Sequence, residues 1–367
     1  RLSLVGSEMC IRDRGYSSPF PWCSDGPRID EFLAEMRREV FEGREGYMNV
    51  GEAPGITPER NEFITNPAHK ELDMLFLFDH VSIDQSPESK WDTHAFVPKK
   101  LQDRMSRQQE AVRNAGWASL FFCNHDQPRV VSRWGNDSDR ESRELSAKAF
   151  GMLLHMHRGT PYIYEGEELG MTNAHFTELG QYRDLEAINA YRQRVEEARC
   201  QSPESMMAAL ALIGRDNSRT PMQWDASRYA GFTPADAATE PWIGVNPNHV
   251  EINAAEEFDD PDSVYGFYKK LIAMRHDNAT VATGEWNLLA ADDEQVYAFT
   301  RTSGDDTILV VVNLTDRSAG LPGEVAELLG DGVAESQILL STYDVAHGVK
   351  SIARGELARW EGVVIQL

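Results

Sequence analysis

Residues 116–126 read Gly-Trp-Ala-Ser-Leu-Phe-Phe-Cys-Asn-His-Asp, and this stretch contains the clearest signal of the fold class. Its apolar run, 120–123, predicts a short buried strand that ends at the polar residues Asn124, His125 and Asp126. A polar helix is expected before it, over about 100–115, and a glycine separates the helix from the strand. The stretch therefore predicts a helix, a turn and a strand, with polar side chains just past the end of the strand.

The same order of elements recurs along the chain. An amphipathic helix over 29–40 leads to a strand at 47–50, a further strand is expected at 75–78, and a helix over 144–156 leads to a strand at 161–164. Polar residues follow each of these strands. Strands that alternate with helices predict a parallel sheet, because parallel neighbours require a crossover connection.

The alternation stops after Gly170. Residues 172–253 are expected to form an insertion, with one charged helix at 185–199 followed by loop-like sequence, and an amphipathic helix over 263–274 closes the layered domain. From about residue 280 the pattern changes to short strands separated by turn-forming residues, predicted at 286–289, 296–300, 307–314, 337–341 and 362–367. Such spacing predicts a small antiparallel sandwich, so the expected fold class is an α/β domain followed by an all-β domain.

Composition excludes several classes of function. The 367 residues carry 59 Asp and Glu against 36 Lys and Arg, which gives a formal net charge of −23. This charge argues against nucleic acid and against anionic membrane surfaces as partners, because both are bound by clustered basic residues. The longest unbroken apolar stretch, 206–213, falls far short of the ~20 residues of a membrane helix. No membrane and no nucleic-acid partner is expected.

The cysteines argue against a disulfide framework and against a metal site. Cys10, Cys23, Cys123 and Cys200 are far apart and form no CxxC pair, and no histidine lies at a zinc-ligand spacing from them. Buried or incidental thiols in a reducing compartment are the preferred interpretation, which predicts a cytoplasmic protein. The sequence predicts no metal and no cofactor.

Side chains just past the strand ends of a parallel α/β barrel point into one shared mouth, where such enzymes keep their catalytic groups. That geometry predicts that Glu52, His125, Asp126 and Glu168 lie close together. Two carboxylates at one pocket are what glycoside hydrolysis requires, one as a protonated acid and the other ionised. On this argument alone, the alternative of chance placement of carboxylates in an acidic protein is the stronger one.

Four segments carry a more specific signal. They are Val50-Gly51-Glu52-Ala53-Pro54-Gly55; Phe122-Cys123-Asn124-His125-Asp126-Gln127-Pro128-Arg129; Gly159-Thr160-Pro161-Tyr162-Ile163-Tyr164 with Gly166-Glu167-Glu168-Leu169-Gly170-Met171; and Arg215-Asp216-Asn217-Ser218-Arg219-Thr220-Pro221-Met222-Gln223-Trp224. In this order they resemble the α-amylase superfamily, and within it the branch of α-glucosidases, oligo-1,6-glucosidases and trehalose-6-phosphate hydrolases. The resemblance covers about residue 27 to the C-terminus. It implies the C-terminal half of a (β/α)8 TIM barrel, strands five to eight, over residues 16–279, followed by a sandwich domain over 280–367.

The resemblance also implies a role for each matching position. Glu52 matches the family's general acid/base at the end of the fifth barrel strand. Asp126 matches the carboxylate that stabilises the oxocarbenium-like transition state, and His125 matches its sugar-binding neighbour. Either Arg215 or Arg219 corresponds to the arginine that grips the terminal glucose. Arg215 is favoured, and for each arginine the alternative is a salt bridge that holds the insertion to the barrel.

The family's nucleophile is the Asp of a Gly-Phe-Arg-x-Asp strand, and this string does not occur in the chain. Gly26-Pro27-Arg28-Ile29-Asp30 imitates it, but Asp30 opens an amphipathic helix, where the helix dipole favours acidic residues. Residues 1–15 show neither helical nor strand periodicity, and we expect them to be a non-native tail joined to a truncated reading frame. Retaining hydrolysis forms a covalent glycosyl intermediate, so a chain without the nucleophile is expected to be inactive.

The resulting expectation is a fragment of an enzyme that hydrolyses terminal α-glucosidic bonds of short oligosaccharides with retention. Within the same class, a trehalose-6-phosphate hydrolase or a glucosyl-transferring relative is the alternative. From another class, the alternative is a non-catalytic relative, either a carbohydrate-binding remnant or a transporter-associated ectodomain. The presence of both Glu52 and Asp126 counts against a long-standing loss of catalysis.

Overall fold

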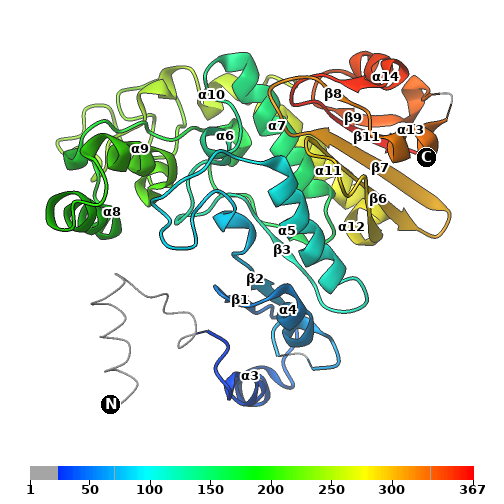
Figure 1. Ribbon diagram of the computed structural model, residues 1–367, viewed down its shortest axis with the longest axis horizontal. Coiled ribbons are helices and arrows are strands. Elements are labelled where there is room, and N and C mark those ends of the chain that lie inside the picture. The colour runs from blue at the N-terminus through cyan, green and yellow to red at the C-terminus, as the bar shows by residue number, and fades with distance from the viewer. Residues whose placement is uncertain (1–23, 70, 331) are drawn as a thin grey trace. The chain divides into compact units, whose positions relative to one another are not determined.

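The computed structural model describes residues 24–69, 71–330 and 332–367, which divide into two compact units. The first unit comprises the described residues up to 79 together with 111–119, and the second comprises 80–110 and 120–367 (Figure 1). The expected non-native tail, 1–15, lies outside the described residues, as do Cys10 and Cys23.

Parallel strands form the sheet of the first unit, as the alternation of strands and helices predicts. β1 (Val50–Glu52) pairs in parallel with β2 (Met74–Phe76). Leu75 of β2 also forms a parallel bridge with Ala118 on its other side. Three strand segments therefore follow one another side by side in chain order, which is the pattern of a sheet built from crossover connections.

Two helices accompany this sheet. α3 (Ile29–Met36) continues into a π-helical turn, η1 (Arg37–Phe41), and Asp30 lies in the first turn of α3, as expected for a helix-start acid. α4 (Pro58–Thr65) begins after Thr57, whose hydroxyl accepts a hydrogen bond from the Arg60 N–H at 3.2 Å. A small core lies between helices and sheet, with Ala53, Ile64, Leu72 and Leu75 buried.

The first strand begins at Val50, whereas the sequence predicted a start at residue 47. The Asn49 N–H donates to Asp73 Oδ2 at 2.8 Å, and the Asp73 N–H donates to Asn49 Oδ1 at 2.7 Å. These side-chain bonds occupy the backbone before the ladder starts, so the regular pairing is delayed to Val50. As a result Glu52 is the last residue of the strand.

A long buried helix, α7 (Arg140–Met156), lies at the centre of the second unit. Its N-cap is Asp139, which accepts a hydrogen bond from the Ser142 N–H at 2.9 Å. α11 (Val264–Asp277) packs closely against it, because a Cβ at Gly151 would lie 2.7 Å from the Tyr268 ring. Other helices of this part are α5 (Pro98–Ala111), α6 (Val130–Arg133), α10 (Ala254–Glu257) and α12 (Ala279–Thr283), with short turns η2 (His80–Ser82) and η3 (Glu167–Leu169).

The strands that carry the central motifs are shorter than predicted. β3 covers Ser119–Leu120 and β4 covers Thr160–Pro161, against expected spans of 120–123 and 161–164. The Tyr162 N–H donates to the Leu120 carbonyl at 2.7 Å, so the alignment of the two segments continues past the assigned strands. Residues 121–123 are buried as predicted, but the chain already turns at Asn124, whose Oδ1 accepts the Asp126 N–H at 2.7 Å.

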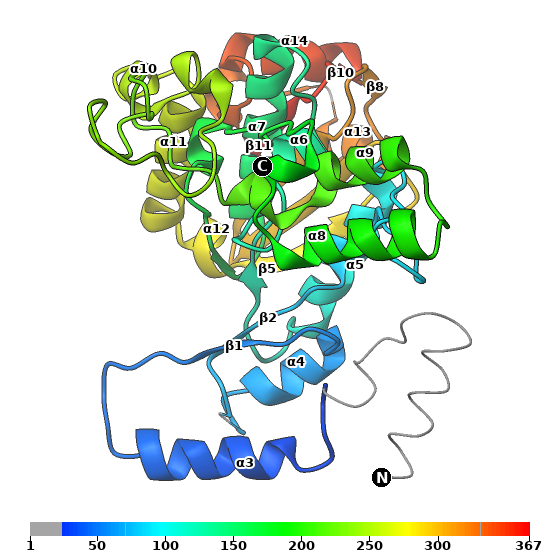
Figure 2. The ribbon, with the colours of Figure 1, turned by 90° about the vertical axis from the view of Figure 1, so that its left-hand side faces the viewer.

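The insertion contains one helix more than predicted. α8 (Leu185–Tyr191) and its π-helical continuation η5 (Arg192–Glu197) match the expected charged helix, whereas α9 (Pro203–Ile213) lies in sequence that we expected to be a loop. Ser202 caps α9 and proline occupies its first turn, a helix-start signal that the composition obscured. α8 and α9 lie side by side (Figure 2) and share a core around Ala187, Met206, Leu210 and Ile213. The remaining turns are η4 (Leu179–Gln181), η6 (Arg215–Ser218) and η7 (Pro247–Val250).

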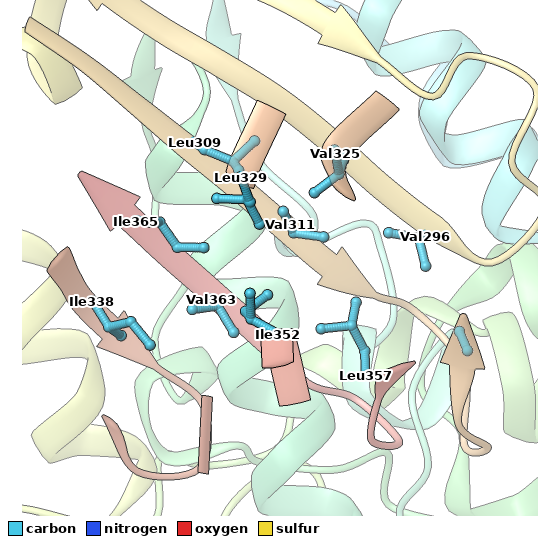
Figure 3. Packing of buried hydrophobic residues seen from close by; sticks show 12 residues of the cluster. Val296, Leu309, Val311, Val325, Leu329, Ile338, Ile352, Leu357, Val363 and Ile365 are labelled. Carbon is cyan, nitrogen blue, oxygen red and sulfur yellow. The ribbon is translucent and has the colours of Figure 1, made fainter. Parts of the chain in front are cut away.

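The C-terminal part contains the predicted antiparallel strands. They form a five-stranded sheet in the order β5-β6-β7-β11-β9 and a two-stranded sheet of β8 and β10. Their bounds are β5 Glu285–Leu289, β6 Val296–Ser303, β7 Asp306–Asn313, β8 Ala319–Gly320, β9 Ile338–Ser341, β10 Glu356–Leu357 and β11 Gly362–Gln366. The sequence did not predict two helices, α13 (Gly323–Leu329) and α14 (Val345–Arg354), nor the turn η8 (Glu335–Gln337). Their aliphatic side chains, Val325, Leu329 and Ile352, pack onto the sheet (Figure 3).

The large sheet is joined to α7 through buried polar groups. Arg301 of β6 donates to the Met156 carbonyl at 2.7 Å and to the Gly284 carbonyl at 2.8 Å. His157, directly after α7, places Nδ1 2.6 Å from the Leu153 carbonyl and Nε2 2.9 Å from the Tyr297 hydroxyl. A carbonyl can only accept, so Nδ1 carries the proton and neutral Nε2 accepts the O–H of Tyr297.

Burial lowers the pKa of His157 to about 3 and that of the neighbouring His155 to about 4. Both pKa values lie below the ~6.5 of an exposed histidine, so the unfolded chain takes up protons that the native protein rejects. We expect these two groups to destabilise the protein progressively as the pH falls from about 6.5 toward 4, by about 3 kcal/mol for His157 alone.

Urea unfolding at pH 7, 6, 5 and 4 tests this expectation, with His157→Gln compared with the unchanged chain. The variant loses stability at pH 7, and the difference between the two free energies of unfolding should shrink toward pH 4. The matched control is His276→Gln at the exposed end of α11, which should leave the pH dependence as it is. A difference for His157→Gln that stays constant with pH would contradict the assignment.

Candidate active site

Asp126 and His125 sit at the tip of the turn that follows β3. The Asn124 side chain fixes the turn by accepting the Asp126 N–H, and residues 124 and 127 form an antiparallel bridge across it. This geometry turns both side chains outward: the carboxylate of Asp126 is 33% exposed and the imidazole of His125 is 66% exposed. His125 Nε2 and Asp126 Oδ2 are 3.7 Å apart.

Two arginines hold the Asp126 carboxylate. Arg219 Nη2 lies 2.5 Å from Oδ1, and Arg215 Nη1 lies 3.4 Å from the same oxygen. Arg219 also donates from Nε to the His125 carbonyl at 2.8 Å, so it fixes the backbone of the turn as well as its carboxylate. Arg215 is the first residue of η6, and Arg219 directly follows η6. The structure therefore brings together four of the predicted site residues, His125, Asp126, Arg215 and Arg219.

Asp184, which the sequence analysis did not single out, is the main partner of Arg215. Its side chain is only 4% exposed and accepts two hydrogen bonds from Arg215, from Nη2 at 2.8 Å and from Nε at 3.0 Å. Burial alone would raise the pKa of Asp184, but the hydrogen bonds from Arg215 bring that pKa below its usual value. The same bonds raise the pKa of Arg215, so both groups stay ionised.

Asp216 positions Asp184 in turn. Its Oδ2 accepts the backbone N–H of Arg183 at 2.6 Å and that of Asp184 at 2.8 Å, and the side chain is fully buried. Asp184 also caps α8 by accepting the Glu186 N–H at 3.2 Å. An Asp at a helix start within Arg183-Asp184-Leu185-Glu186 was a signal of capping in the sequence, but nothing local indicated that its carboxylate would bind an arginine.

Arg215 makes a structural salt bridge and also lies beside the Asp126 carboxylate, so its contacts are compatible with both interpretations from the sequence. Its bidentate bond to Asp184 ties η6 to the start of α8, as the salt-bridge alternative foresaw, and its Nη1 still reaches Asp126. Arg219 makes the shorter contact with Asp126. Both arginine side chains remain about one-quarter exposed, at 28% and 24%, so both stay candidates for contact with a ligand.

Glu168, which the strand-end pattern placed near Asp126, caps its own turn. Its carboxylate accepts the Gly166 N–H at 2.8 Å, and burial raises its pKa. The preceding Glu167 is buried, its Oε1 lies 3.0 Å from the Tyr268 hydroxyl, and burial raises its pKa to about 7. Both carboxylates therefore serve the packing of the segment after β4.

Glu52, the predicted acid/base, belongs to the first unit. His125, Asp126, Arg215 and Arg219, which we call the Asp126 cluster, belong to the second. Within its own unit Glu52 is exposed at the end of β1 and opposite Phe76 of β2. The strand approaches its neighbours closely at the preceding residue: a Cβ on Gly51 would lie 2.6 Å from the Leu75 side chain. This contact fixes the backbone from which the Glu52 side chain extends.

Neither a thiol site nor a metal centre emerges from the described part of the chain. Cys123 is buried, and burial raises its pKa well above the usual value, so it stays a neutral thiol. No group of three or more His, Cys, Asp and Glu residues within 24–69, 71–330 and 332–367 is placed to hold a metal ion. In the same ranges, no helix has both the length and the hydropathy of a membrane span.

Comparisons with known proteins give the same family that the four sequence segments resemble. Residues 12–284 match the family model of the alpha amylase catalytic domain, and residues 286–335 match that of the maltogenic amylase C-terminal domain. The oligo-1,6-glucosidase of Parageobacillus thermoglucosidasius is 41% identical over 356 residues, which cover 96% of this chain and 60% of that protein. The chain thus spans about three-fifths of the length of the first curated relatives it matches.

Solved structures of related enzymes are also similar to this chain. The trehalose-6-phosphate hydrolase of Bacillus licheniformis has a TM-score of 0.81 and 37% identity, covering 95% of this chain and 61% of that chain. A trehalulose synthase variant in complex with its substrate sucrose has a TM-score of 0.82 and 34% identity, covering 93% and 59%.

Proposed function

Because the chain belongs to the alpha amylase catalytic-domain family, we propose that the whole protein hydrolyses terminal α-glucosidic bonds of short oligosaccharides with retention of configuration. The fold class agrees with this family: the C-terminal part of a (β/α)8 barrel is followed by an antiparallel sheet domain. The observation that carries the proposal is the Asp126 carboxylate, which is one-third exposed in the turn after β3 and is held by Arg215 and Arg219.

We assign three roles within this reaction. Glu52 acts as general acid/base, because it is a solvent-facing carboxylic acid at the end of a barrel strand. Asp126 lies beside two guanidinium groups and stabilises the positive charge that develops on the sugar ring. His125 and the two arginines bind sugar hydroxyls, since their donors are exposed around that carboxylate.

The charge of the cluster favours a neutral substrate over a phosphorylated one. The two arginines face four carboxylates at 4.0 Å or less, those of Asp126, Asp184, Glu186 and Asp216. A phosphate would need cations that are not already paired in this way. This balance supports an oligosaccharide hydrolase over the trehalose-6-phosphate alternative. We also propose a cytoplasmic location, where an exposed thiol such as Cys200 stays reduced.

A reconstituted enzyme tests the proposal. In it, a relative's segment that carries the family's Gly-Phe-Arg-x-Asp strand is joined before residue 16 of this chain. We expect it to release glucose from isomaltose. With 4-nitrophenyl α-glucoside, from which only one sugar is released, we expect α-glucose as the first product seen by proton NMR. Initial release of β-glucose from 4-nitrophenyl α-glucoside, or hydrolysis of trehalose 6-phosphate in preference to isomaltose, would contradict the proposal.

The 367-residue chain on its own is expected to release no 4-nitrophenol from 4-nitrophenyl α-glucoside. The family's nucleophile motif is not in this sequence, and without a nucleophile no glycosyl intermediate forms. The measurement is the rate of absorbance increase with the purified chain, compared with its Glu52→Gln variant. Turnover that disappears in the variant would show that another carboxylate of this chain acts as nucleophile.

A further inference from the structure

Three aromatic side chains of the insertion stand exposed to solvent. Trp224 is 52% exposed, Phe232 is 52% exposed and Trp242 is 61% exposed. Four other described tryptophans, Trp91, Trp134, Trp286 and Trp360, are at most 7% exposed, and Trp117 is partly buried. A ring of this size normally buries its surface, so several exposed ones in one segment indicate a binding face.

Hydrogen bonds and an ion pair connect the segments that carry these rings. The Trp224 N–H donates to the Ala230 carbonyl at 2.8 Å, which closes a turn that ends near Phe232. Arg228 within that turn pairs with Glu240 at 3.2 Å, two residues before Trp242. The three rings therefore belong to two chain segments that are bridged to each other. We call the rings of Trp224, Phe232 and Trp242 the aromatic rim.

The aromatic rim is anchored to the Asp126 cluster at both ends. Its first ring, Trp224, follows Arg219 by five residues in the same motif. At the other end, the Trp242 carbonyl accepts a hydrogen bond from Arg183 Nε at 3.0 Å, and the Arg183 N–H is bound by Asp216. The two segments of the rim are thus linked, through the chain at Trp224 and through Arg183 at Trp242, to the polar groups that are candidates for binding the terminal glucose.

Neutral sugars offer two kinds of surface to a protein. Hydroxyl groups need donors and acceptors, which the Asp126 cluster supplies, and the C–H faces of a pyranose ring pack against flat aromatic rings. Resting on the proposed function, we propose that Trp224, Phe232 and Trp242 bind the glucosyl units beyond the terminal one. The protein would then prefer α-linked oligosaccharides of three or more glucose units over disaccharides.

Titration of the 367-residue chain with isomaltotriose, isomaltose and glucose tests this inference, with binding followed by saturation-transfer NMR and calorimetry. We expect isomaltotriose to bind about tenfold more tightly than glucose. Trp224→Ala and Trp242→Ala should each weaken isomaltotriose binding about three- to tenfold, with little effect on glucose. Trp224→Phe and Trp242→Phe should retain most of the affinity, because a flat ring remains.

The matched control is Phe258→Ala, which removes an equally exposed ring that instead stacks on Tyr265. It should leave isomaltotriose binding unchanged, and urea midpoints show that each variant is folded. Three results would each contradict the proposed binding role of the aromatic rim: equal affinities for glucose and isomaltotriose, no binding by the unchanged chain, or unchanged binding in both alanine variants.

Binding and hydrolysis are measured on different proteins, so their failures can be told apart. Loss of binding in the alanine variants, with no hydrolysis by the reconstituted enzyme, contradicts the proposed reaction but supports the rim. If the reconstituted enzyme hydrolyses isomaltose but the alanine variants bind isomaltotriose as well as the unchanged chain, the binding role of the aromatic rim is contradicted and the proposed reaction is not.

Discussion

Replacing Glu52 by Gln in the reconstituted enzyme is expected to lower kcat for isomaltose about 10²- to 10⁴-fold, the usual contribution of general acid–base catalysis. The leaving group from isomaltose is a sugar alkoxide, which departs only if its oxygen is protonated. A glutamine side chain has the shape of glutamic acid but cannot donate that proton. Glu52 is exposed at the end of β1, so the substitution is expected to leave the fold intact.

A comparison of substrates separates loss of the acid from general damage. 4-Nitrophenolate leaves without protonation, so 4-nitrophenyl α-glucoside should lose far less of its first chemical step than isomaltose. The second step needs Glu52 as a base for water, and azide, which needs no base, should restore turnover and give α-glucosyl azide. Glu45→Gln, also exposed in the first unit, is the matched control and should behave as the unchanged enzyme. Equal losses on both substrates without azide rescue would remove Glu52 from this role.

The largest effect on stability is expected from Asp84. Its carboxylate and the Arg133 guanidinium are each 1% exposed, with Nε–Oδ2 and Nη2–Oδ1 distances of 2.7 Å. Trp134 Nε1 donates to the same carboxylate at 2.9 Å. Asp84→Asn leaves the positive charge of Arg133 buried without a counter-ion, and we expect a loss of about 3–5 kcal/mol in the free energy of unfolding.

The measurement is urea unfolding at pH 7, with the midpoint and the slope compared between variants. The matched control is Asp92→Asn, because Asp92 pairs with Arg194 at 2.6 Å but is 41% exposed, and we expect a change of at most about 1 kcal/mol. Asp84→Leu combined with Arg133→Met removes both charges and should recover much of the loss. A single Asp84→Asn variant as stable as the control would contradict the assignment.

This ion pair also supports the candidate site. Arg133 donates from Nη1 to Gln127 Oε1 at 2.9 Å, and Gln127 directly follows Asp126 in the turn. Loss of Asp84 should therefore loosen the turn that carries the Asp126 carboxylate as well as the core beneath it. In the reconstituted enzyme, kcat is expected to fall together with stability for this variant.

Several parts of the fold were predictable because their signals are local. The strands at 286–289, 296–300 and 307–314 correspond to β5, β6 and β7 within a few residues, since β-branched and aromatic runs between turn residues depend on neighbours in sequence. α9 was missed although Ser202 and Pro203 mark a helix start, because the surrounding proline and asparagine content favoured a loop. α13 and α14 were missed in a region that was interpreted only through its strands.

The sequence alone identified the candidate site residues, since Glu52, His125, Asp126, Arg215 and Arg219 stand in motifs that are specific over several consecutive positions. It also determined the order of strands and helices, because hydrophobic periodicity reflects burial of each segment by itself. The partners of the two arginines, by contrast, depend on the tertiary structure. Asp184 takes two hydrogen bonds from Arg215 across 31 residues of sequence, and Asp126 meets Arg219 across 93. Such pairs form where packing brings two loops together, and no local propensity encodes that distance.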